Sequence, residues 1–372
     1  MREPTVTDQH PRFRPVLDRF AAYRPRPGPA GPDGALFELA SNESPFGPVP
    51  SVIQAISAAS AGINRYPDAA AAALTQAIAD CHGVPPSHVV VGCGSTGLIQ
   101  ALLAAAAGPG DQVVCPWRSF EAYPILIGLA GAEEVRVPLH DERHDLAAMA
   151  AAITGATRAV LICSPNNPTG TVVGRGELVA FLRQVPPDCL VILDEAYAEY
   201  VRDPHAARGL DLYHGHPNLA VLRTFSKAYG LAGARVGYLV AHEPVARAAR
   251  AATPAFSVSA LAQAAAAAAL AAGPELAQQV DWVVRERTRV RGELLAQGWT
   301  VPQSAANFVW LRLGPRTLSF AAACAQAGIR IRAYDDEGTR VSIGSQAAND
   351  AFLTVAAAQC GHDRPAVQEG SC

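Results

Sequence analysis

Short apolar runs alternate with amphipathic stretches along most of the chain. The apolar runs are residues 88–92, 112–115, 134–137, 159–163, 190–194, 220–224 and 236–240. Helical periodicity covers residues 51–60, 69–82, 95–107, 120–130, 145–152 and 174–184. This alternation is typical of strands joined by crossover helices. It predicts an α/β fold, with a mostly parallel sheet covered on both faces by helices.

The pattern changes at both ends of this region. After Pro254 it predicts an alanine-rich helix, a charged helix around Val280 to Gln297 and a smaller α+β unit. The segments expected in that unit are a strand at 307–313, a helix at 317–327, the run GIRIRAY and a strand at 340–344. Residues 1–34 are rich in Pro, Arg and Gly, which favours an extended arm. We therefore expect an arm (1–34), a large domain (35–253) and a small C-terminal domain (254–372).

Composition narrows the classes of protein to consider. Half of the 372 residues are hydrophobic, enough for a large core, and the net charge of -3 lacks the basic excess that nucleic acid requires. The eight cysteines form no CxxC pair and are expected to be free thiols in a reducing compartment. No apolar run has the length of a signal peptide near the N-terminus or of a membrane span. We expect a cytoplasmic protein without a membrane or nucleic-acid partner.

One lysine stands among 29 arginines. Lys227 lies in RTFSKAYGLAGARVGY, directly after an apolar run. Arginine stays protonated in proteins, whereas a lysine becomes a neutral nucleophile once burial or neighbouring charge lowers its pKa. A chain that uses arginine elsewhere and lysine here indicates a site that needs an amine. The alternative is a lysine retained by chance on a loop.

Two further elements suit a phosphate group. Ser226 and Arg235 supply a hydroxyl and a guanidinium on either side of Lys227. Ser95 and Thr96 follow an apolar run and open a predicted helix, whose N-terminus favours anions. Together with the amine, these groups point to a phosphorylated aldehyde.

The same glycine-rich stretch, GCGSTG at 92–97, also matches the dinucleotide-binding fingerprint GxGxxG. That fingerprint requires an acidic residue about 20 positions further on, at the end of the next strand. Here the next apolar run leads into Pro116 and Trp117 instead, and Glu121 falls inside the following helix. The fingerprint therefore lacks its ribose partner.

Asp194 and Tyr197 lie at the carboxyl end of an apolar run, in LVILDEAYAEY. Ligand contacts in α/β proteins concentrate at this end of strands. A buried aspartate can keep a pyridine nitrogen protonated, and a nearby tyrosine can bond a phenolic oxygen. The alternative reading of Asp194 is a helix N-cap. The loop at 164–170, SPNNPTG, also follows an apolar run. Taken alone, it is better explained as a proline-stiffened turn than as a ligand site.

Taken together, SPNNPTGT, LDEAYAEY and TFSKAYGLAGARVGY resemble the pyridoxal-phosphate aminotransferases of the aspartate-aminotransferase fold (PLP fold type I). LASNESPFGP, NRYPD, SAANFVWL and TRVSIGS are similar to the histidinol-phosphate aminotransferase branch, so the resemblance covers nearly the whole chain. VGCGSTG, WRSFEAYPI and VLRTFSKAYGLAG look closer still to actinobacterial aromatic amino acid (phenylalanine) aminotransferases.

The resemblance implies pyridoxal 5'-phosphate as cofactor and a role for each matching residue. Lys227 would bind the cofactor's aldehyde and then move a proton between the substrate and the cofactor. Asp194 would pair with the pyridine nitrogen, and Tyr197 and Asn167 would bond the phenolic oxygen. The residues expected to hold the phosphate are Ser95, Thr96, Ser226 and Arg235. Phe120 would stack on the ring, and Tyr66 would reach the cofactor of the neighbouring subunit in a homodimer.

For the substrate, the resemblance implies that Arg340 grips the carboxylate, that Tyr23 closes over the site and that Arg332 helps to hold the phosphate of histidinol phosphate. The expected reaction moves an amino group between an aromatic L-amino acid and 2-oxoglutarate. Histidinol phosphate is the alternative substrate. The motifs GST and WRSF depart from the usual histidinol-phosphate pattern. A decarboxylase or lyase on the same fold, or a regulator without turnover, are further alternatives, although the arm lacks a helix-turn-helix pattern.

Two histidine pairs invite a metal interpretation. His140 and His144 stand four residues apart, and His214 and His216 flank a glycine. Neither pair has a third ligand at a suitable spacing, so we expect no metal site.

Overall fold

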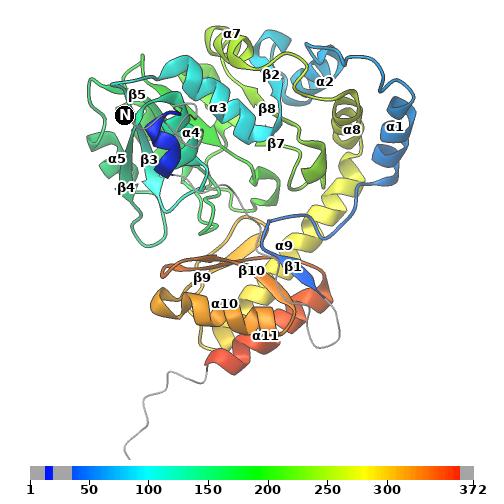
Figure 1. Ribbon diagram of the computed structural model, residues 1–372, viewed down its shortest axis with the longest axis vertical. Helices are drawn as coiled ribbons and strands as arrows, with labels where there is room; N and C mark the ends of the chain where they lie inside the picture. Colours follow the sequence, from blue (N-terminus) through cyan, green and yellow to red (C-terminus); the bar gives the residue numbers. More distant parts are fainter. Residues whose placement is uncertain (1–12, 20–35, 361–372) are drawn as a thin grey trace, which may run out of the picture.

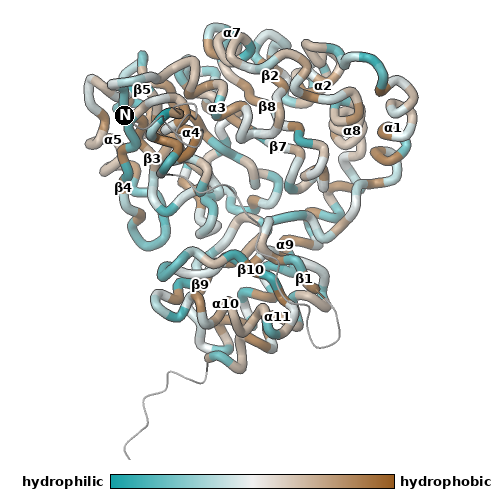
Figure 2. The backbone as a smooth tube through the Cα atoms, viewed as in Figure 1, coloured by the Kyte–Doolittle hydropathy of each residue, from teal (hydrophilic) through white to brown (hydrophobic). Residues whose placement is uncertain are grey.

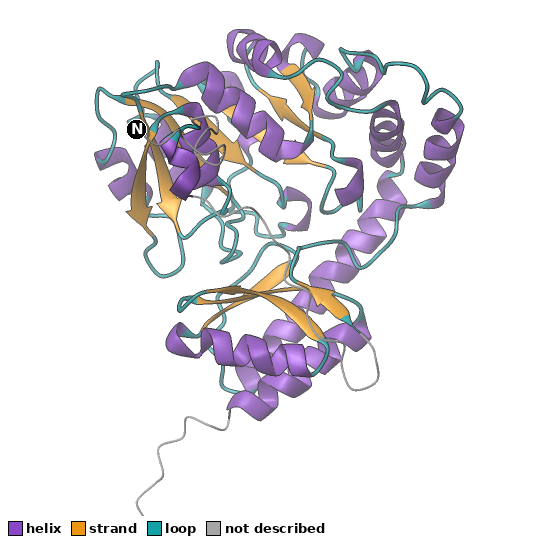
Figure 3. Cartoon of the chain, in the orientation of Figure 1, coloured by secondary structure: helices purple, strands orange, loops and turns teal. Residues whose placement is uncertain are grey.

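The computed structural model describes residues 13–19 and 36–360 and consists of a large and a small lobe. The long helix α9 (Gly273–Ala296) runs from the large lobe into the small one (Figure 1). Figure 3 shows a sheet in each lobe, with helices on both faces of the larger sheet.

Among these residues, the large sheet has seven strands in the order β2-β8-β7-β6-β5-β3-β4. Their bounds are β2 (Val89–Gly92), β3 (Gln112–Trp117), β4 (Glu133–Pro138), β5 (Thr157–Cys163), β6 (Leu190–Asp194), β7 (Leu219–Thr224) and β8 (Gly237–Val240). β8 is antiparallel to β2 and β7, and the remaining pairs are parallel. The expected α/β fold with a mostly parallel sheet is confirmed.

Both faces of this sheet are buried, which is why its strands are almost continuously apolar. In β5, Val160 and Ile162 pack on one side and Leu161 on the other. The helices on the Val160 side are α1 (Pro50–Ser60), α2 (Ala72–His82), α5 (Leu146–Ala151), α6 (Arg175–Leu182) and α8 (Ala260–Ala271). Those on the Leu161 side are α3 (Gly94–Ala106), α4 (Tyr123–Ala130) and α7 (Glu243–Ala252). Figure 2 shows the apolar character of α4.

Two helices begin three residues later than their periodicity predicts, each for a local reason. The Asp68 carboxylate accepts hydrogen bonds from the N–H groups of Ala70 and Ala72, so α2 begins at Ala72 and not at residue 69. These bonds also lower the pKa of Asp68. α4 begins at Tyr123 because a proline occupies the first turn, where its missing N–H costs nothing.

The small lobe is built on a sheet of four strands within the described residues, in the order β1-β10-β11-β9. They are β1 (Phe37–Leu39), β9 (Phe308–Arg312), β10 (Ile329–Tyr334) and β11 (Gly338–Ser342). α10 (Thr317–Gln326) and α11 (Gln346–Cys360) lie with α9 on the face away from the large lobe (Figures 1 and 3). The other face of the sheet therefore points toward the large lobe.

The lobes divide differently from the expected boundary at residue 254. β1, expected in the large domain, pairs with β10 of the small sheet. α8, expected in the small domain, packs in the large core through Ala262, Ala265 and Ala269. Small side chains on both faces of a helix leave no amphipathic stripe, so the sequence could not show which lobe covers it.

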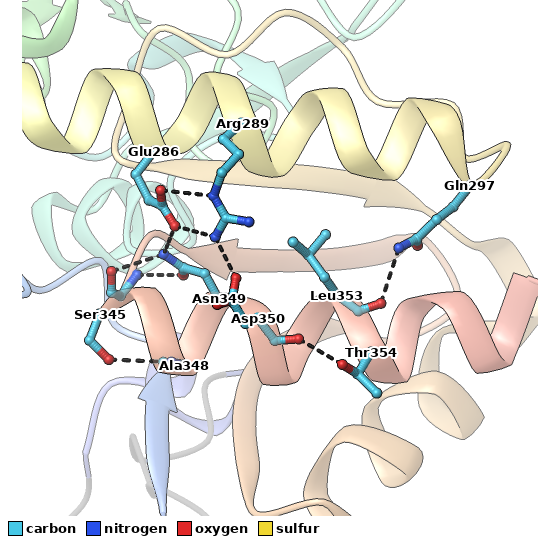
Figure 4. Close-up of polar contacts among 10 residues, drawn as sticks. Glu286, Arg289, Gln297, Ser345, Ala348, Asn349, Asp350, Leu353 and Thr354 are labelled. Atoms are coloured by element: carbon cyan, nitrogen blue, oxygen red, sulfur yellow. Dashed lines mark hydrogen bonds and ion pairs between the residues drawn. The ribbon is translucent and has the colours of Figure 1, made fainter.

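Hydrogen bonds and ion pairs join α11 to α9 (Figure 4). Glu286 accepts from Asn349 at 3.1 Å and from Arg289 Nε at 3.0 Å, and Arg289 Nη2 also donates to Asp350 at 2.6 Å. Gln297 donates to the Leu353 carbonyl oxygen at 3.1 Å. α9 therefore holds the small lobe's helical layer in place.

Within residues 13–19 and 36–360, no single helix is both long and apolar enough to cross a membrane. α8 and α9 pass such a test only as a pair, and they are bent by 83° relative to each other.

Candidate active site

A cavity of about 640 Å³ opens at the carboxyl ends of β5, β6 and β7, facing the small sheet. Its wall includes the last residue of each of these strands: Cys163, Asp194 and Thr224. The residues that the sequence predicted for the site and that line this cavity are Ser95, Thr96, Phe120, Asn167, Asp194, Tyr197, Ser226, Lys227, Arg235, Arg332 and Arg340. The structure thus brings together residues from both lobes.

One end of the cavity is a cradle for an anion. Ser95 and Thr96 lie in the first turn of α3, where the helix N-terminus favours negative charge. Arg235 Nη1 donates to the Ser226 hydroxyl at 3.2 Å. Gly94 has a φ of +70°, and a Cβ there would lie 2.7 Å from Arg235 Nη2. The glycine therefore permits the guanidinium to approach the start of the helix.

Lys227 projects into the same cavity. Its Nζ donates to the carbonyl oxygen of Ser41 at 3.1 Å, in the segment that follows β1. Burial, with the nearby guanidinium of Arg340, lowers the pKa of Lys227 to about 7. An amine with this pKa is partly neutral near physiological pH and can attack a carbonyl group.

Asp194 lies buried at the end of β6, and burial raises its pKa to about 6. Tyr123 donates to Asp194 Oδ2 at 3.1 Å and the N–H of Ala196 donates to Oδ1 at 3.2 Å, and both bonds oppose that rise. A carboxylate fixed in this way suits pairing with a buried cation. The sequence reasoning missed Tyr123; the available signal was a tyrosine on the apolar face of a helix, whose buried hydroxyl needs a partner.

The Tyr197 hydroxyl accepts a hydrogen bond from Asn42 Nδ2 at 2.9 Å. Asn42 has a φ of +54°, which asparagine tolerates well, and its N–H and side chain also bond Ser342 of β11. Burial raises the pKa of Tyr197, so the hydroxyl stays protonated. Asn42 was not among the predicted site residues, because its partners lie 155 and 300 positions away in the chain.

Arg340 presents a buried cation to the cavity. Its Nη1 donates to Asn167 Oδ1 at 2.6 Å and to the Tyr334 hydroxyl at 3.1 Å, and its Nη2 donates to the Ala40 carbonyl oxygen. Its Nε is buried without a hydrogen-bond partner in the described part of the chain. Because these acceptors are uncharged, they do not compensate the positive charge of the guanidinium, which can attract an anionic ligand.

Arg332 has a different partner. Its Nη2 and Nε donate to Glu121 Oε2 at 2.7 and 3.2 Å, which joins the small sheet to the loop before α4. Glu121 also lines the cavity. The sequence reasoning did not assign it a role, since the two residues are 211 positions apart.

Two predicted residues are not among those that the structure shows at the cavity. Tyr66 is outside the cavity lining and 84% exposed, with its ring 4.8 Å from that of Phe256. Tyr23 lies outside the described residues. The structure therefore leaves their predicted roles as expectations.

The dinucleotide alternative for GCGSTG does not fit the sheet. That fingerprint belongs to a strand with parallel neighbours inside a βαβ unit. Here β2 lies at the edge of the sheet, and its neighbour β8 is antiparallel. The loop opens α3 at the cavity, where it contributes to the anion cradle.

His140 and His144 lie in different environments. His140 is exposed and lies 3.5 Å from Asp141, whereas the ring nitrogens of His144 are buried. Within the described ranges, no group of three or more His, Cys, Asp or Glu side chains is arranged to hold a metal ion.

Comparisons with known proteins agree with this site. Residues 35–355 match the family Aminotransferase class I and II. The chain is 59% identical to an aromatic amino acid aminotransferase of Thermobifida fusca, over 93% of this chain and 96% of that protein. It is 52% identical to the protein of the same name in Streptomyces coelicolor, over 94% and 98%.

Among solved structures, the histidinol-phosphate aminotransferase of Sinorhizobium meliloti in complex with pyridoxal-5'-phosphate superposes with a TM-score of 0.84. It is 29% identical, and the match covers 95% of this chain and 99% of that one. The expected aspartate-aminotransferase-like fold is thereby confirmed, and the chain belongs to the class I and II aminotransferases.

Proposed function

We propose that the protein is a pyridoxal-phosphate-dependent transaminase that moves an amino group between an aromatic L-amino acid and 2-oxoglutarate. The observation that carries the proposal is one cavity holding an amine with a depressed pKa, a buried carboxylate and an anion cradle. The relatives named aromatic amino acid aminotransferase, at 52 to 59% identity, support the substrate class.

The residues present fit this cofactor. Ser95, Thr96, Ser226 and Arg235 would hold its phosphate in a cradle that a side chain at Gly94 would obstruct. Asp194 would pair with the ring nitrogen, and Tyr197 with the Nδ2 end of Asn167 would donate to the ring oxygen. Phe120 would cover the ring. When bound, pyridoxal phosphate supplies an aldehyde for the amine and an electron-accepting ring.

Three side chains of the protein would take part in the reaction. Lys227 Nζ would take a proton from the substrate's α carbon and return one to the cofactor, since its pKa lies close to the working pH. Arg340 would bind the α-carboxylate and fix the orientation of that carbon. Asp194, as an anion, would hold positive charge on the ring nitrogen.

The depressed pKa of Lys227 predicts how the cofactor-free protein captures pyridoxal phosphate. Below pH 7 the amine is mostly protonated and cannot attack, so the rate should rise about tenfold per pH unit and level off above about pH 8. Stopped-flow absorbance on mixing protein and cofactor measures this rate. A rate that keeps climbing toward about pH 10.4, the pKa of an ordinary lysine, would contradict the assigned role of the cavity.

A second candidate substrate is histidinol phosphate, because Arg332 lines the cavity beside Arg340. The two candidates are distinguished by measuring kcat/KM for phenylalanine and for histidinol phosphate, each with 2-oxoglutarate. We expect the larger value for phenylalanine. A far larger value for histidinol phosphate would overturn the aromatic assignment while leaving transamination intact.

The proposal includes a homodimer with shared sites, in which Tyr66 reaches the phosphate of the partner's cofactor. Its support is an exposed apolar patch formed by Ile63, Tyr66 and Phe256, which are 67%, 84% and 45% exposed. Such side chains are typical of an interface.

Mixed dimers test this arrangement. Tyr66→Ala and Lys227→Arg chains should each have low activity alone, and random pairing should restore about a quarter of the wild-type value, because half of the dimers then hold one intact site. Native mass spectrometry confirms that mixed dimers form. Mixed dimers without recovered activity would contradict a site shared across subunits.

A further inference from the structure

The two arginines of the small sheet that line the cavity differ in their ionic partners. Arg332 of β10 and Arg340 of β11 lie directly opposite each other in an antiparallel pair, so their side chains leave the same face of the sheet. Arg340 donates to uncharged oxygen atoms of Asn167, Tyr334 and Ala40. Arg332 donates to a carboxylate, that of Glu121. Glu121 therefore compensates the positive charge of Arg332, whereas the described partners of Arg340 do not compensate its charge.

The Arg332–Glu121 pair is well formed and borders the cavity. Two guanidinium nitrogens share one carboxylate oxygen, at 2.7 and 3.2 Å. Both side chains keep about a third of their surface, 36% for Arg332 and 33% for Glu121. Solvent therefore screens the pair, and an arriving ligand can reach it. Ala122 and Ile125, which follow Glu121 in the chain, add apolar surface to the same wall.

Arg118, a further arginine near this wall, is also paired with a carboxylate. The guanidinium groups of Arg118 and Arg332 lie 5.5 and 5.7 Å from the centre of the Tyr334 ring. Arg118 is held by a salt bridge to Glu337. The positive charge that Arg340 presents to the cavity therefore suits the α-carboxylate that amino acids and 2-oxo acids share.

We propose that Glu121 is a specificity-determining residue of the transaminase: by neutralising Arg332 it disfavours substrates whose side chain ends in an anion, and phosphomonoesters most of all. This inference rests on the proposed function. A phosphate dianion at Arg332 would have to displace the Glu121 carboxylate or lie against it, and like charges brought together oppose binding. A neutral aromatic ring carries no such cost and packs against the apolar wall.

Glu121→Gln tests the proposal, because it removes the charge and keeps the shape. We measure kcat/KM for phenylalanine and histidinol phosphate with 2-oxoglutarate as acceptor, and for glutamate with phenylpyruvate as acceptor. Relative to phenylalanine, the value for glutamate should rise about threefold and that for histidinol phosphate about tenfold, graded by side-chain charge. These gains should shrink at high salt. An equal change for all three substrates, or a loss confined to histidinol phosphate, would overturn the proposal.

Glu337→Gln is the matched control. It breaks a salt bridge that also joins the lobes, but Glu337 lies outside the cavity lining, so both ratios should keep their wild-type values. A rise in the ratios with Glu337→Gln would assign the effect to lobe contact and overturn the role of Glu121.

Unreactive probes separate this inference from the proposed function. Dissociation constants of 3-phenylpropionate, glutarate and 3-phosphonopropionate on the holoenzyme come from calorimetry. Glu121→Gln should tighten the phosphonate most, glutarate less and the phenyl probe least. Failure of the wild type to transaminate phenylalanine would refute the proposed function, whereas a loss of this graded order would refute the role of Glu121.

Discussion

Lys227→Arg is expected to abolish transamination, with kcat reduced at least about 10⁴-fold, the scale seen when a catalytic nucleophile is removed. Arginine keeps the positive charge, so electrostatic attraction for the cofactor's phosphate remains. It cannot lose its proton in a protein, so neither carbonyl attack nor proton transfer is available. Steady-state kinetics measure the loss, and the visible absorbance of the bound cofactor should disappear with it.

The chain offers a control for this change, because Lys227 is its single lysine. Arg183 lies exposed on the C-terminal side of α6, and Arg183→Lys combined with Lys227→Arg keeps the overall composition. The double variant should be as inactive as Lys227→Arg. Substantial turnover in either variant would show that another group performs the chemistry.

Asp194→Asn is expected to have the second largest effect, lowering kcat about 10³-fold, since a neutral amide cannot balance a buried cation. The side chain keeps its size, so the cavity should retain its shape. Asp194 has a pKa of about 6 and is ionised at neutral pH, where its charge would hold a proton on the ring nitrogen. Single-turnover kinetics with phenylalanine measure the loss.

Asp188→Asn is the matched control for Asp194→Asn. Asp188 is exposed, just before β6, whereas Asp194 is buried at the other end of the same strand. This variant should keep wild-type turnover. An Asp194→Asn protein that folds and turns over within a few-fold of wild type would contradict the assigned role of the carboxylate.

Much of the fold could be predicted because it follows from local patterns. Strands buried on both faces must be apolar throughout, so the run 190–194 coincides with β6 and the run 159–163 with all but the first two residues of β5. The candidate residues at strand ends could be predicted for the same reason. Parallel strands bring their carboxyl ends to one edge, where Asp194 and Lys227 line the same cavity.

The features that the sequence could not show depend on distant contacts. Three residues of β1 are too few for a periodic signal, and their partner in β10 lies about 290 positions away. The role of Asn42 depends on its hydrogen bond to Tyr197, and the role of Glu121 depends on its pairing with Arg332. Both partners are distant in the sequence. Residue type alone gave no means of choosing Glu121 among 33 acidic residues.

The most direct test follows the amino nitrogen of phenylalanine. Purified protein supplied with pyridoxal phosphate is incubated with ¹⁵N-labelled phenylalanine and 2-oxoglutarate, and the products are identified by mass spectrometry. We predict phenylpyruvate and ¹⁵N-glutamate in equal amounts. Release of labelled ammonia or of carbon dioxide, with no label in glutamate, would contradict the central claim that this cavity transfers an amino group.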